Sequence, residues 1–287
     1  MSILTNLNGT IAPTASLSVL ERGFLYGDSV YEVVRTYQGK HFGLAEHLVR
    51  LRNSAQYLYM DVPWSDEHIR NEIERTLAQA DWSDSYVRIV VSRGAETHIS
   101  LKPSADIRPN LLIVLSEISP TPEMSQEGLH LVIPDRLRND PRALSPAAKT
   151  GNYLNNILAL MEAQSLGGDD ALLLNNQGLI TEATTSNIWL VKQGKVFTPK
   201  AEVGILHGIT RDFIFEILEQ AKIPYETVLW TEDDLQDIEE GFLSSSVRLL
   251  MPIHQINSTK IPQVPGPITQ KVWDAFIELM AKTVAAA

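Results

Sequence analysis

The residue with the clearest chemical potential is Lys149, in the stretch Ala147-Ala148-Lys149-Thr150-Gly151-Asn152-Tyr153-Leu154. Small, uncharged residues flank it, and an apolar segment with helical spacing follows. Such a setting removes water from an amine and favours its neutral, nucleophilic form. Most lysines are solvated surface charges, so Lys149 alone is weak evidence for catalysis. If it acts as a nucleophile, the other parts of its site must come from elsewhere in the chain.

Two segments have the composition of an anion site. Residues 204–212 form a glycine-containing turn that opens a helix, and Thr210 occupies the expected N-cap position. The N–H groups and the dipole at such a helix start attract phosphate, although a well-capped helix without a ligand has the same pattern. Residues 244–246 are three serines after an apolar pair, and their hydroxyls either bind phosphate or turn the chain.

Several charged residues leave two interpretations open. Glu182 is a lone acid among small polar residues, so it either pairs with a cationic nitrogen or is an ordinary loop acid. Arg50 lies off the apolar stripe of a predicted helix, and its spacing favours a solvated side chain. His98 and His207 are the histidines of most interest, and a satisfied or solvated histidine explains both.

The composition limits the class of protein. A hydrophobic content of 44% and a charged content of 21% are typical of a soluble globular chain. The net charge of −11 argues against nucleic acid as a general partner. There are no cysteines, no P-loop, no dinucleotide fingerprint and no His-Glu-x-x-His motif, so we predict no metal site. No apolar run is long enough for a membrane span and no signal peptide is evident, which together predict a cytoplasmic protein.

The order of elements predicts an α+β fold. Tight turns join many of the strands, which disfavours a doubly wound sheet. Helices are expected at residues 44–60, 65–80, after Lys149 to about residue 166, at 211–222 and at 267–283. Strands are expected in a hairpin over 3–12 and at 30–37, 86–92, 111–115, 129–133, 170–174, 187–191 and 195–197, with a loop at 22–28. A segment with two prolines and a glycine predicts a linker at 119–133, between a small α/β domain (1–118) and a larger domain (134–287).

Six blocks, in order, resemble the class IV aminotransferases, the pyridoxal-phosphate enzymes that include branched-chain aminotransferases, D-amino-acid aminotransferases and aminodeoxychorismate lyases. The resemblance covers nearly the whole chain, from about residue 3 to 280. It implies a fold of two domains, the larger with a β-barrel-like core. The blocks are Arg22-Gly23-x-x-Tyr26-Gly27-Asp28-x-Val30-Tyr31-Glu32, Glu46-His47-Leu48-x-Arg50-Leu51, Lys149 with Asn152-Tyr153-Leu154, Glu182-x-x-x-x-Asn187, Gly208-Ile209-Thr210-Arg211, and Ser244-Ser245-Ser246 leading to Met251-Pro252.

The resemblance assigns a role to each block. Lys149 would form the Schiff base with pyridoxal 5′-phosphate and carry the proton, and Glu182 would hold the pyridine nitrogen protonated. Arg50 would reach the phosphate, which overrides its interpretation as a solvated side chain. The remaining cofactor contacts would come from Tyr153, Leu206, Ile209, Thr210, Ser245 and Ser246.

The substrate is less well defined by the resemblance. Tyr86-x-Arg88 is similar to the branched-chain group, whose substrate is an L-branched-chain amino acid with a 2-keto acid such as 2-oxoglutarate as acceptor. The lysine-to-Asn-Tyr spacing and Val33 are similar to the D-amino-acid and lyase branches, so a D-amino-acid or (R)-amine transaminase, or a lyase, is the alternative. Arg248 either binds an acidic substrate or points to solvent. The expected substrate-binding residues are Tyr26, Tyr31, Val33, Tyr86, Arg88, Val247 and Arg248. The family also implies at least a homodimer.

Overall fold

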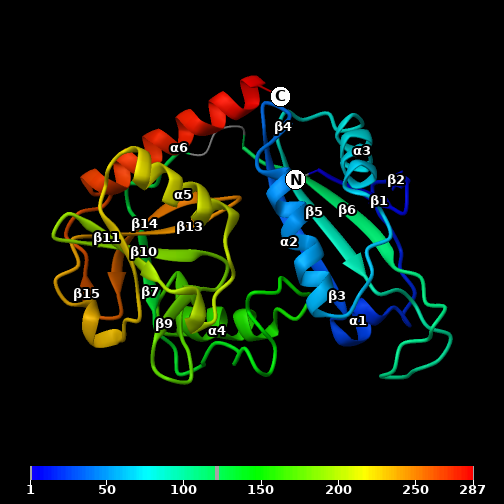
Figure 1. The fold of residues 1–287 in the computed structure, drawn as a ribbon, viewed down its shortest axis with the longest axis horizontal. Helices are drawn as coiled ribbons and strands as arrows, with labels where there is room; N and C mark the ends of the chain where they lie inside the picture. Colours follow the sequence, from blue (N-terminus) through cyan, green and yellow to red (C-terminus); the bar gives the residue numbers. More distant parts are fainter. Residues whose placement is uncertain (1, 120–122, 287) are drawn as a thin grey trace. The chain divides into compact units, whose positions relative to one another are not determined.

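The structure, a computed structural model, describes residues 2–119 and 123–286 of the 287-residue chain. Its described residues pack into two units (Figure 1). Of the described residues, unit 1 contains 2–119, 148–152 and 283–286, and unit 2 contains 123–147 and 153–282. The predicted linker over 119–133 and the boundaries of the two predicted domains stay predictions. Residues 120–122 of that linker lie outside the described part of the chain.

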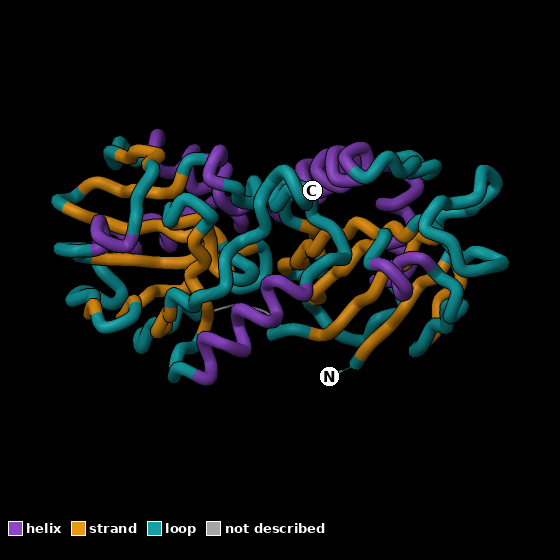
Figure 2. Tube along the Cα trace, turned by 90° about the horizontal axis from the view of Figure 1, so that it is seen from below, coloured by secondary structure: helices purple, strands orange, loops and turns teal. Residues whose placement is uncertain are grey.

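Unit 1 is built on a six-stranded sheet in the order β2-β1-β6-β5-β3-β4, in which every neighbouring pair is antiparallel. In each unit the strands gather in one sheet with helices outside it (Figure 2). The elements of unit 1 are β1 (Ile3–Leu7), β2 (Thr10–Ala12), α1 (Arg22–Tyr26), β3 (Ser29–Tyr37), β4 (Lys40–His41), α2 (Leu44–Tyr57), α3 (Asp66–Leu77), β5 (Ser85–Ser92) and β6 (Asn110–Glu117).

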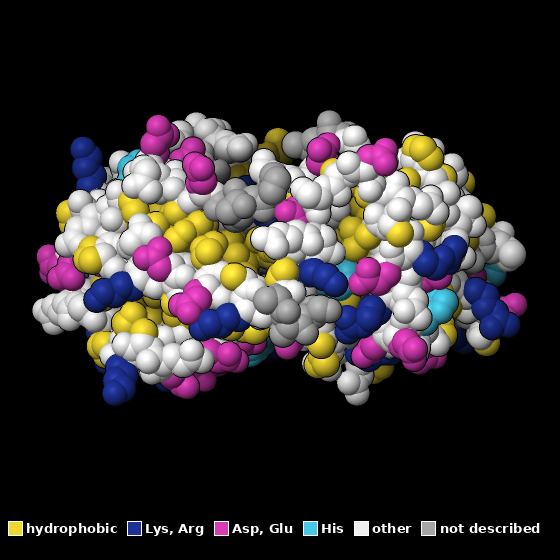
Figure 3. Space-filling view, turned by 90° about the horizontal axis from the view of Figure 1, so that it is seen from above, with side chains coloured by type: hydrophobic (Ala, Val, Ile, Leu, Met, Phe, Trp, Pro, Cys, Tyr) yellow, Lys and Arg dark blue, Asp and Glu magenta, His cyan; other side chains and the backbone are white. Residues whose placement is uncertain are grey.

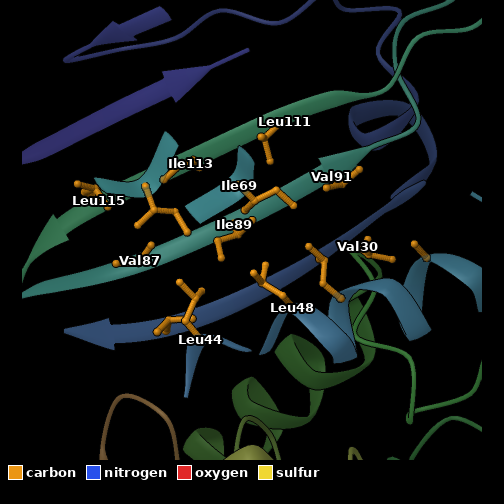
Figure 4. Packing of buried hydrophobic residues seen from close by; sticks show 14 of the residues in the cluster. Val30, Leu44, Leu48, Ile69, Val87, Ile89, Val91, Leu111, Ile113 and Leu115 are labelled. Carbon is orange, nitrogen blue, oxygen red and sulfur yellow. The ribbon is translucent and has the colours of Figure 1, made fainter. Parts of the chain in front are cut away.

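Helices α2 and α3 both cover one face of this sheet. The side chains that alternate along β3, β5 and β6 supply the apolar partners, as period-2 patterning requires. Figure 4 shows them directed at the helices, with Leu44 and Leu48 of α2 facing Val30, Val87 and Ile89. On the opposite face of the sheet, the side chains of β5 and β6 are half-buried.

Unit 2 is built on a nine-stranded mixed sheet in the order β12-β11-β10-β13-β14-β7-β8-β9, with β15 paired to β14. The last strand, β9, also lies against β10 and β11, so the sheet curls back on itself as an incomplete barrel. Its elements are β7 (Leu129–Val132), α4 (Leu154–Ser165), β8 (Asp170–Leu174), β9 (Ile180–Ala183), β10 (Asn187–Lys192), β11 (Lys195–Pro199), η1 (Ala201–Val203), α5 (Ile209–Gln220), β12 (Tyr225–Val228), η2 (Glu232–Leu235), β13 (Glu240–Ser245), β14 (Leu249–Ile256), β15 (Thr259–Lys260) and α6 (Pro267–Ala286).

The predicted α+β class is confirmed, as are the hairpin over 3–12 and the start of the last helix at Pro267. The loop expected at 22–28 is wrong, because residues 22–26 form α1. The Glu21 carboxylate accepts hydrogen bonds from the backbone of Gly23 and Phe24, and Gly27 ends the helix in the left-handed conformation (φ 68°). Caps at both ends therefore stabilise a helix that is too short for hydrophobic periodicity to reveal.

Candidate active site

Lys149 lies beside β3 in unit 1. The backbone N–H of Tyr31 donates to the Lys149 carbonyl (3.0 Å), and the N–H of Gly151 donates to the Ser29 carbonyl (2.8 Å). This short antiparallel pairing places Lys149 opposite Tyr31, so both side chains leave the same face of the sheet. The Lys149 Nζ atom is 4.4 Å from the centroid of the Tyr31 ring. The guanidinium of Arg88 is 3.8 Å from the same centroid.

The face that carries Lys149 also carries the other strand residues predicted to bind substrate. Val33 is opposite Arg88 in the β3–β5 register, and Tyr86 follows on the same face two positions along β5. This is the face of the sheet turned away from α2 and α3. The structure therefore groups Lys149 with Tyr31, Val33, Tyr86 and Arg88. Tyr26, also in unit 1, is the last residue of α1, and the Arg22 guanidinium is 5.1 Å from its ring centroid.

Arg50 is buried, so its interpretation as a solvated side chain is wrong. Its Nε and Nη2 atoms each donate to one carboxylate oxygen of Glu32, both at 2.7 Å, which is a bidentate pair. The Nδ1 atom of His47 lies 2.7 Å from Glu32 Oε2. Glu32 lies on the same face of β3 as the core residues Val30 and Val34, and a carboxylate on a buried face requires partners of this kind.

The electrostatics of this cluster follow from its burial. Burial alone would raise the pKa of Glu32, but the charge and hydrogen bonds of Arg50 and the hydrogen bond of His47 outweigh it and lower that pKa to about 2. Desolvation lowers the pKa of His47 from its ordinary 6.5. At neutral pH the cluster therefore contains an ionised carboxylate, a permanent guanidinium and a neutral imidazole. His98 and His207, by contrast, are exposed.

Glu182 lies on β9 in unit 2 and is 4% exposed. Its carboxylate accepts from Arg138 Nη2 (2.9 Å) and Nε (3.2 Å), from Asn187 Nδ2 (3.2 Å) and from the backbone N–H of Leu206 (3.1 Å). These partners are all donors, which suits an ionised, acceptor-only carboxylate. The sequence did not single out Arg138, because it lies in a charged, irregular stretch whose pattern indicates only a loop.

Asn187 links Glu182 to the start of α5. Its Nδ2 atom also donates to the Leu206 carbonyl (3.0 Å), and a Cβ atom on Gly208 would lie 2.1 Å from its Oδ1 atom. Gly208, not Thr210, is the N-cap of α5, so the N-cap predicted at Thr210 is wrong. Gly208 has no side chain with which to cap the helix start, and Ile209 and Thr210 are buried in its first turn. Uncapped N–H groups and the helix dipole form an anion site.

Of the three serines predicted to form a turn, Ser244 and Ser245 lie in β13 and only Ser246 follows the strand, in the same unit. Ser244 pairs with Asn187 in the sheet, and its hydroxyl accepts from the indole N–H of Trp189 (2.9 Å). Ser245 ends β13, and Ser246 and Val247 lie half-buried in the turn. Tyr153, at the N-cap of α4, is half-buried. The structure thus gathers Glu182, Leu206, the start of α5 and Ser244 around Asn187.

Comparison with known proteins decides the family. The profile of the family described as Amino-transferase class IV matches residues 29–256. The chain belongs to the class IV aminotransferases. It is an aminotransferase, and class IV aminotransferases use pyridoxal phosphate.

Three similar proteins illustrate the range of this family. A Methanocaldococcus jannaschii protein, provisionally named a branched-chain-amino-acid aminotransferase, is 34% identical over 93% of this chain and 92% of its own. A D-alanine aminotransferase of Bacillus licheniformis is 29% identical over 99% of this chain and 100% of its own. The crystal structure of the branched-chain aminotransferase from the archaeon Thermoproteus uzoniensis with norvaline has a TM-score of 0.89, 28% identity, and coverage of 96% of this chain and 94% of its own.

The described surface mixes charges of both signs. On the face shown in Figure 3, basic side chains are interspersed with acidic ones. Within residues 2–119 and 123–286, no cluster of three or more histidines and acids is arranged to hold a metal ion. No helix in the same described residues is long and apolar enough to cross a bilayer.

Proposed function

We propose that this class IV aminotransferase transfers an amino group between a hydrophobic or branched-chain L-amino acid and a 2-keto acid such as 2-oxoglutarate. The observation that carries the proposal is the position of Lys149. Its amine leaves the sheet face that also carries Tyr31, Val33 and Tyr86. Aromatic and aliphatic side chains around a nucleophilic amine suit a substrate with an apolar side chain.

The donor set fits pyridoxal 5′-phosphate. An uncapped helix start and serine hydroxyls suit a phosphate, and the buried Glu182 carboxylate suits a pyridinium nitrogen. When bound, the cofactor supplies an electron sink for the substrate's Cα. The residues that we propose to hold it are Arg50, Lys149, Tyr153, Glu182, Leu206, Ile209, Thr210, Ser245 and Ser246.

Each charged residue has a distinct task. With the cofactor bound, the Lys149 amine would be the group that takes up and releases the proton of the substrate's Cα. Glu182 holds the proton on the pyridine nitrogen, and the Arg138 fork holds Glu182 in place. Arg50 binds the phosphate while Glu32 fixes the plane of its guanidinium. Tyr26, Tyr31, Val33, Tyr86, Arg88, Val247 and Arg248 contact the substrate.

An enantiomer screen tests this function. The holoenzyme is mixed with L-leucine and 2-oxoglutarate, and glutamate formation is measured. We expect turnover with L-leucine and none after Lys149→Ala, whose circular dichroism should match the wild type. Activity confined to D-alanine or D-glutamate would contradict the substrate class, and normal turnover by Lys149→Ala would contradict the role of the lysine.

A D-amino-acid transaminase is the second candidate. It is favoured by the relative named D-alanine aminotransferase, which aligns over 99% of this chain. The same screen separates the two candidates, because the L- and D-enantiomers of an amino acid present their Cα hydrogens to opposite sides of the site. An (R)-amine transaminase and an aminodeoxychorismate lyase remain alternatives on this scaffold, and pyruvate release from aminodeoxychorismate is the assay for the lyase. A homodimer and a cytoplasmic location stay predictions.

A further inference from the structure

Lys149 belongs to a short segment that is attached to unit 1 by a few hydrogen bonds. The residues before and after this segment belong to unit 2, whereas residues 148–152 pack with unit 1. Strand β3 holds the middle of the segment, because the Lys149 carbonyl accepts from Tyr31 and the Gly151 N–H donates to Ser29. These bonds leave the N-terminal side of the lysine to be held by another element.

Ser54 holds that side. Its Oγ atom accepts from the backbone N–H of Lys149 (3.0 Å), a residue 95 positions away in the sequence. Ser54 lies in α2 and is 1% exposed, between the core residues Leu51 and Ala55. A buried hydroxyl among apolar side chains costs free energy unless it forms a hydrogen bond, and alanine is the better helix former. The bond to Lys149 is therefore what a serine provides at this position.

Two peptide planes meet at the Cα atom of Lys149, and a different element holds each of them. Because a peptide group is planar, a hydrogen bond to the N–H fixes the plane before Cα and one to the carbonyl fixes the plane after it. Ser54 of α2 holds the first plane and Tyr31 of β3 holds the second. Together they fix the direction in which the lysine side chain leaves the backbone. The position of its Nζ atom, 4.4 Å from the Tyr31 ring centroid, depends on that direction.

The helix that carries Ser54 is itself fixed against β3. His47, Arg50 and Ser54 are spaced at i, i+3 and i+7, so they share one side of α2, and all three are buried. His47 and Arg50 contact the carboxylate of Glu32, the residue after Tyr31 on β3. Ser54 is thus held on a rigid element, as precise placement of a reacting group requires.

We propose that Ser54 is a positioning residue for Lys149, whose backbone it fixes so that the amine meets the proton of the substrate's Cα. The inference rests on the proposed role of Lys149 as nucleophile and proton carrier. Ser54 contacts the lysine's backbone N–H, so it acts through Lys149 and takes up no proton itself. A displacement of about 1 Å at a reacting group costs up to about 100-fold in rate. The effect of losing Ser54 is therefore on kcat and not on KM.

Substitutions at Ser54 test this role in the holoenzyme, with whichever amino-acid enantiomer it turns over. Ser54→Ala removes the acceptor, and Ser54→Cys replaces it with a weak one in a side chain of similar size. Each should lower kcat about 5- to 100-fold and leave KM within about two-fold. Ser54→Thr keeps the hydroxyl and should retain most of the wild-type kcat.

Ser85→Ala is the matched control. Ser85 of β5 is also 1% exposed in unit 1, its hydroxyl accepts from the indole N–H of Trp82 (2.7 Å), and its side chain leaves the sheet face opposite to Tyr86. It should unfold at a lower urea concentration, as Ser54→Ala should, and keep the wild-type kcat. An equal loss of kcat in Ser85→Ala, or a raised KM with unchanged kcat in Ser54→Ala and Ser54→Cys, would overturn the proposal.

Amide hydrogen exchange keeps the test independent of turnover. Selective isotope labelling of lysine, with Lys149→Arg to identify the signal, follows the Lys149 N–H in the full-length holoenzyme. This N–H should exchange about 5-fold or more faster in Ser54→Ala, since it loses its acceptor, and at the wild-type rate in Ser85→Ala. Normal turnover by Lys149→Ala would contradict the proposed role of the lysine. Unchanged exchange and unchanged kcat in both Ser54→Ala and Ser54→Cys would overturn the role of Ser54 alone.

Discussion

Glu182 is a buried carboxylate whose environment depends on one arginine. Arg138 supplies two of its hydrogen bonds, and neither side chain is exposed enough for water to replace the other. Removing one partner of a buried ion pair leaves an uncompensated charge, which costs far more than the intact pair contributes. The free energy of unfolding should therefore fall more when only Arg138 or only Glu182 loses its charge than when both do.

Arg138→Met should destabilise the protein by about 3–5 kcal/mol. The double variant Arg138→Met/Glu182→Gln should recover part of that loss, because the residue left behind is neutral and can still accept from Asn187 and Leu206. The measurement is the urea midpoint of the apoprotein at neutral pH. A single variant that unfolds at the wild-type midpoint would show that Glu182 does not depend on Arg138.

At the residue scale, the sequence pointed to single charged residues but not to the residues that they contact. Spacing suggested a solvated Arg50, because one helix pattern cannot show that β3 brings Glu32 against it. His47 lies in the block Glu46-His47-Leu48-x-Arg50-Leu51, but nothing in the sequence indicates that it contacts Glu32. Arg138 carried no signal, since its only distinguishing feature is a contact with a residue 44 positions away. Long-range pairing of this kind is invisible to local pattern.

Among the secondary-structure elements, α5 matters most to the site. Its start was predicted within two residues, but the cap was assigned to Thr210 because hydroxyl residues favour that position. Gly208 takes it instead, since Asn187 occupies the space that a side chain at 208 would need. The rule failed at a candidate functional site, where an uncapped helix start leaves its N–H groups available for an anion.

Gly208→Ala should lower cofactor affinity about 5- to 100-fold, because its Cβ would displace Asn187 and weaken its bonds to Glu182 and Leu206. Alanine tolerates the backbone there, where φ is −75°. Dialysis against graded pyridoxal phosphate, followed by absorbance, measures the affinity.

Gly194→Ala is the matched control for that change. Gly194 is in a hairpin turn with φ at +72° and no atom within 4 Å of an added Cβ. It should cost about 1 kcal/mol of unfolding free energy through the backbone alone and leave cofactor affinity unchanged. Equal cofactor affinity in both variants would show that Asn187 does not connect the helix start to the site.

At the scale of the whole molecule, the fold class was predictable because tight turns and hydrophobic periods are local features. The assignment of Lys149 to a packing unit was not. Chain order places it among the residues of unit 2, yet residues 148–152 pack with unit 1 through hydrogen bonds to β3. An edge pairing of a few residues has no periodicity of its own, so only the structure reveals it.

The stability of the whole chain should fall as the pH drops below 6.5, and His47 should account for part of that fall. Burial lowers the pKa of His47 in the folded state, so between that pKa and 6.5 the unfolded chain binds a proton that the folded chain does not. Proton uptake by the unfolded state lowers the free energy of unfolding as pH decreases. Glu32, with its pKa lowered to about 2, acts in a separate window, from about 4.5 downward.

His47→Gln removes the titrating ring and keeps an N–H donor for Glu32. We expect its urea midpoint to fall less between pH 7 and pH 5 than the midpoint of the wild type, because the extra proton uptake by the unfolded chain is gone. His98→Gln, the same change at an exposed histidine, should retain the wild-type slope. Parallel slopes for His47→Gln and the wild type would mean that His47 is protonated alike in the folded and unfolded chain, and the acid sensitivity would then belong to other groups.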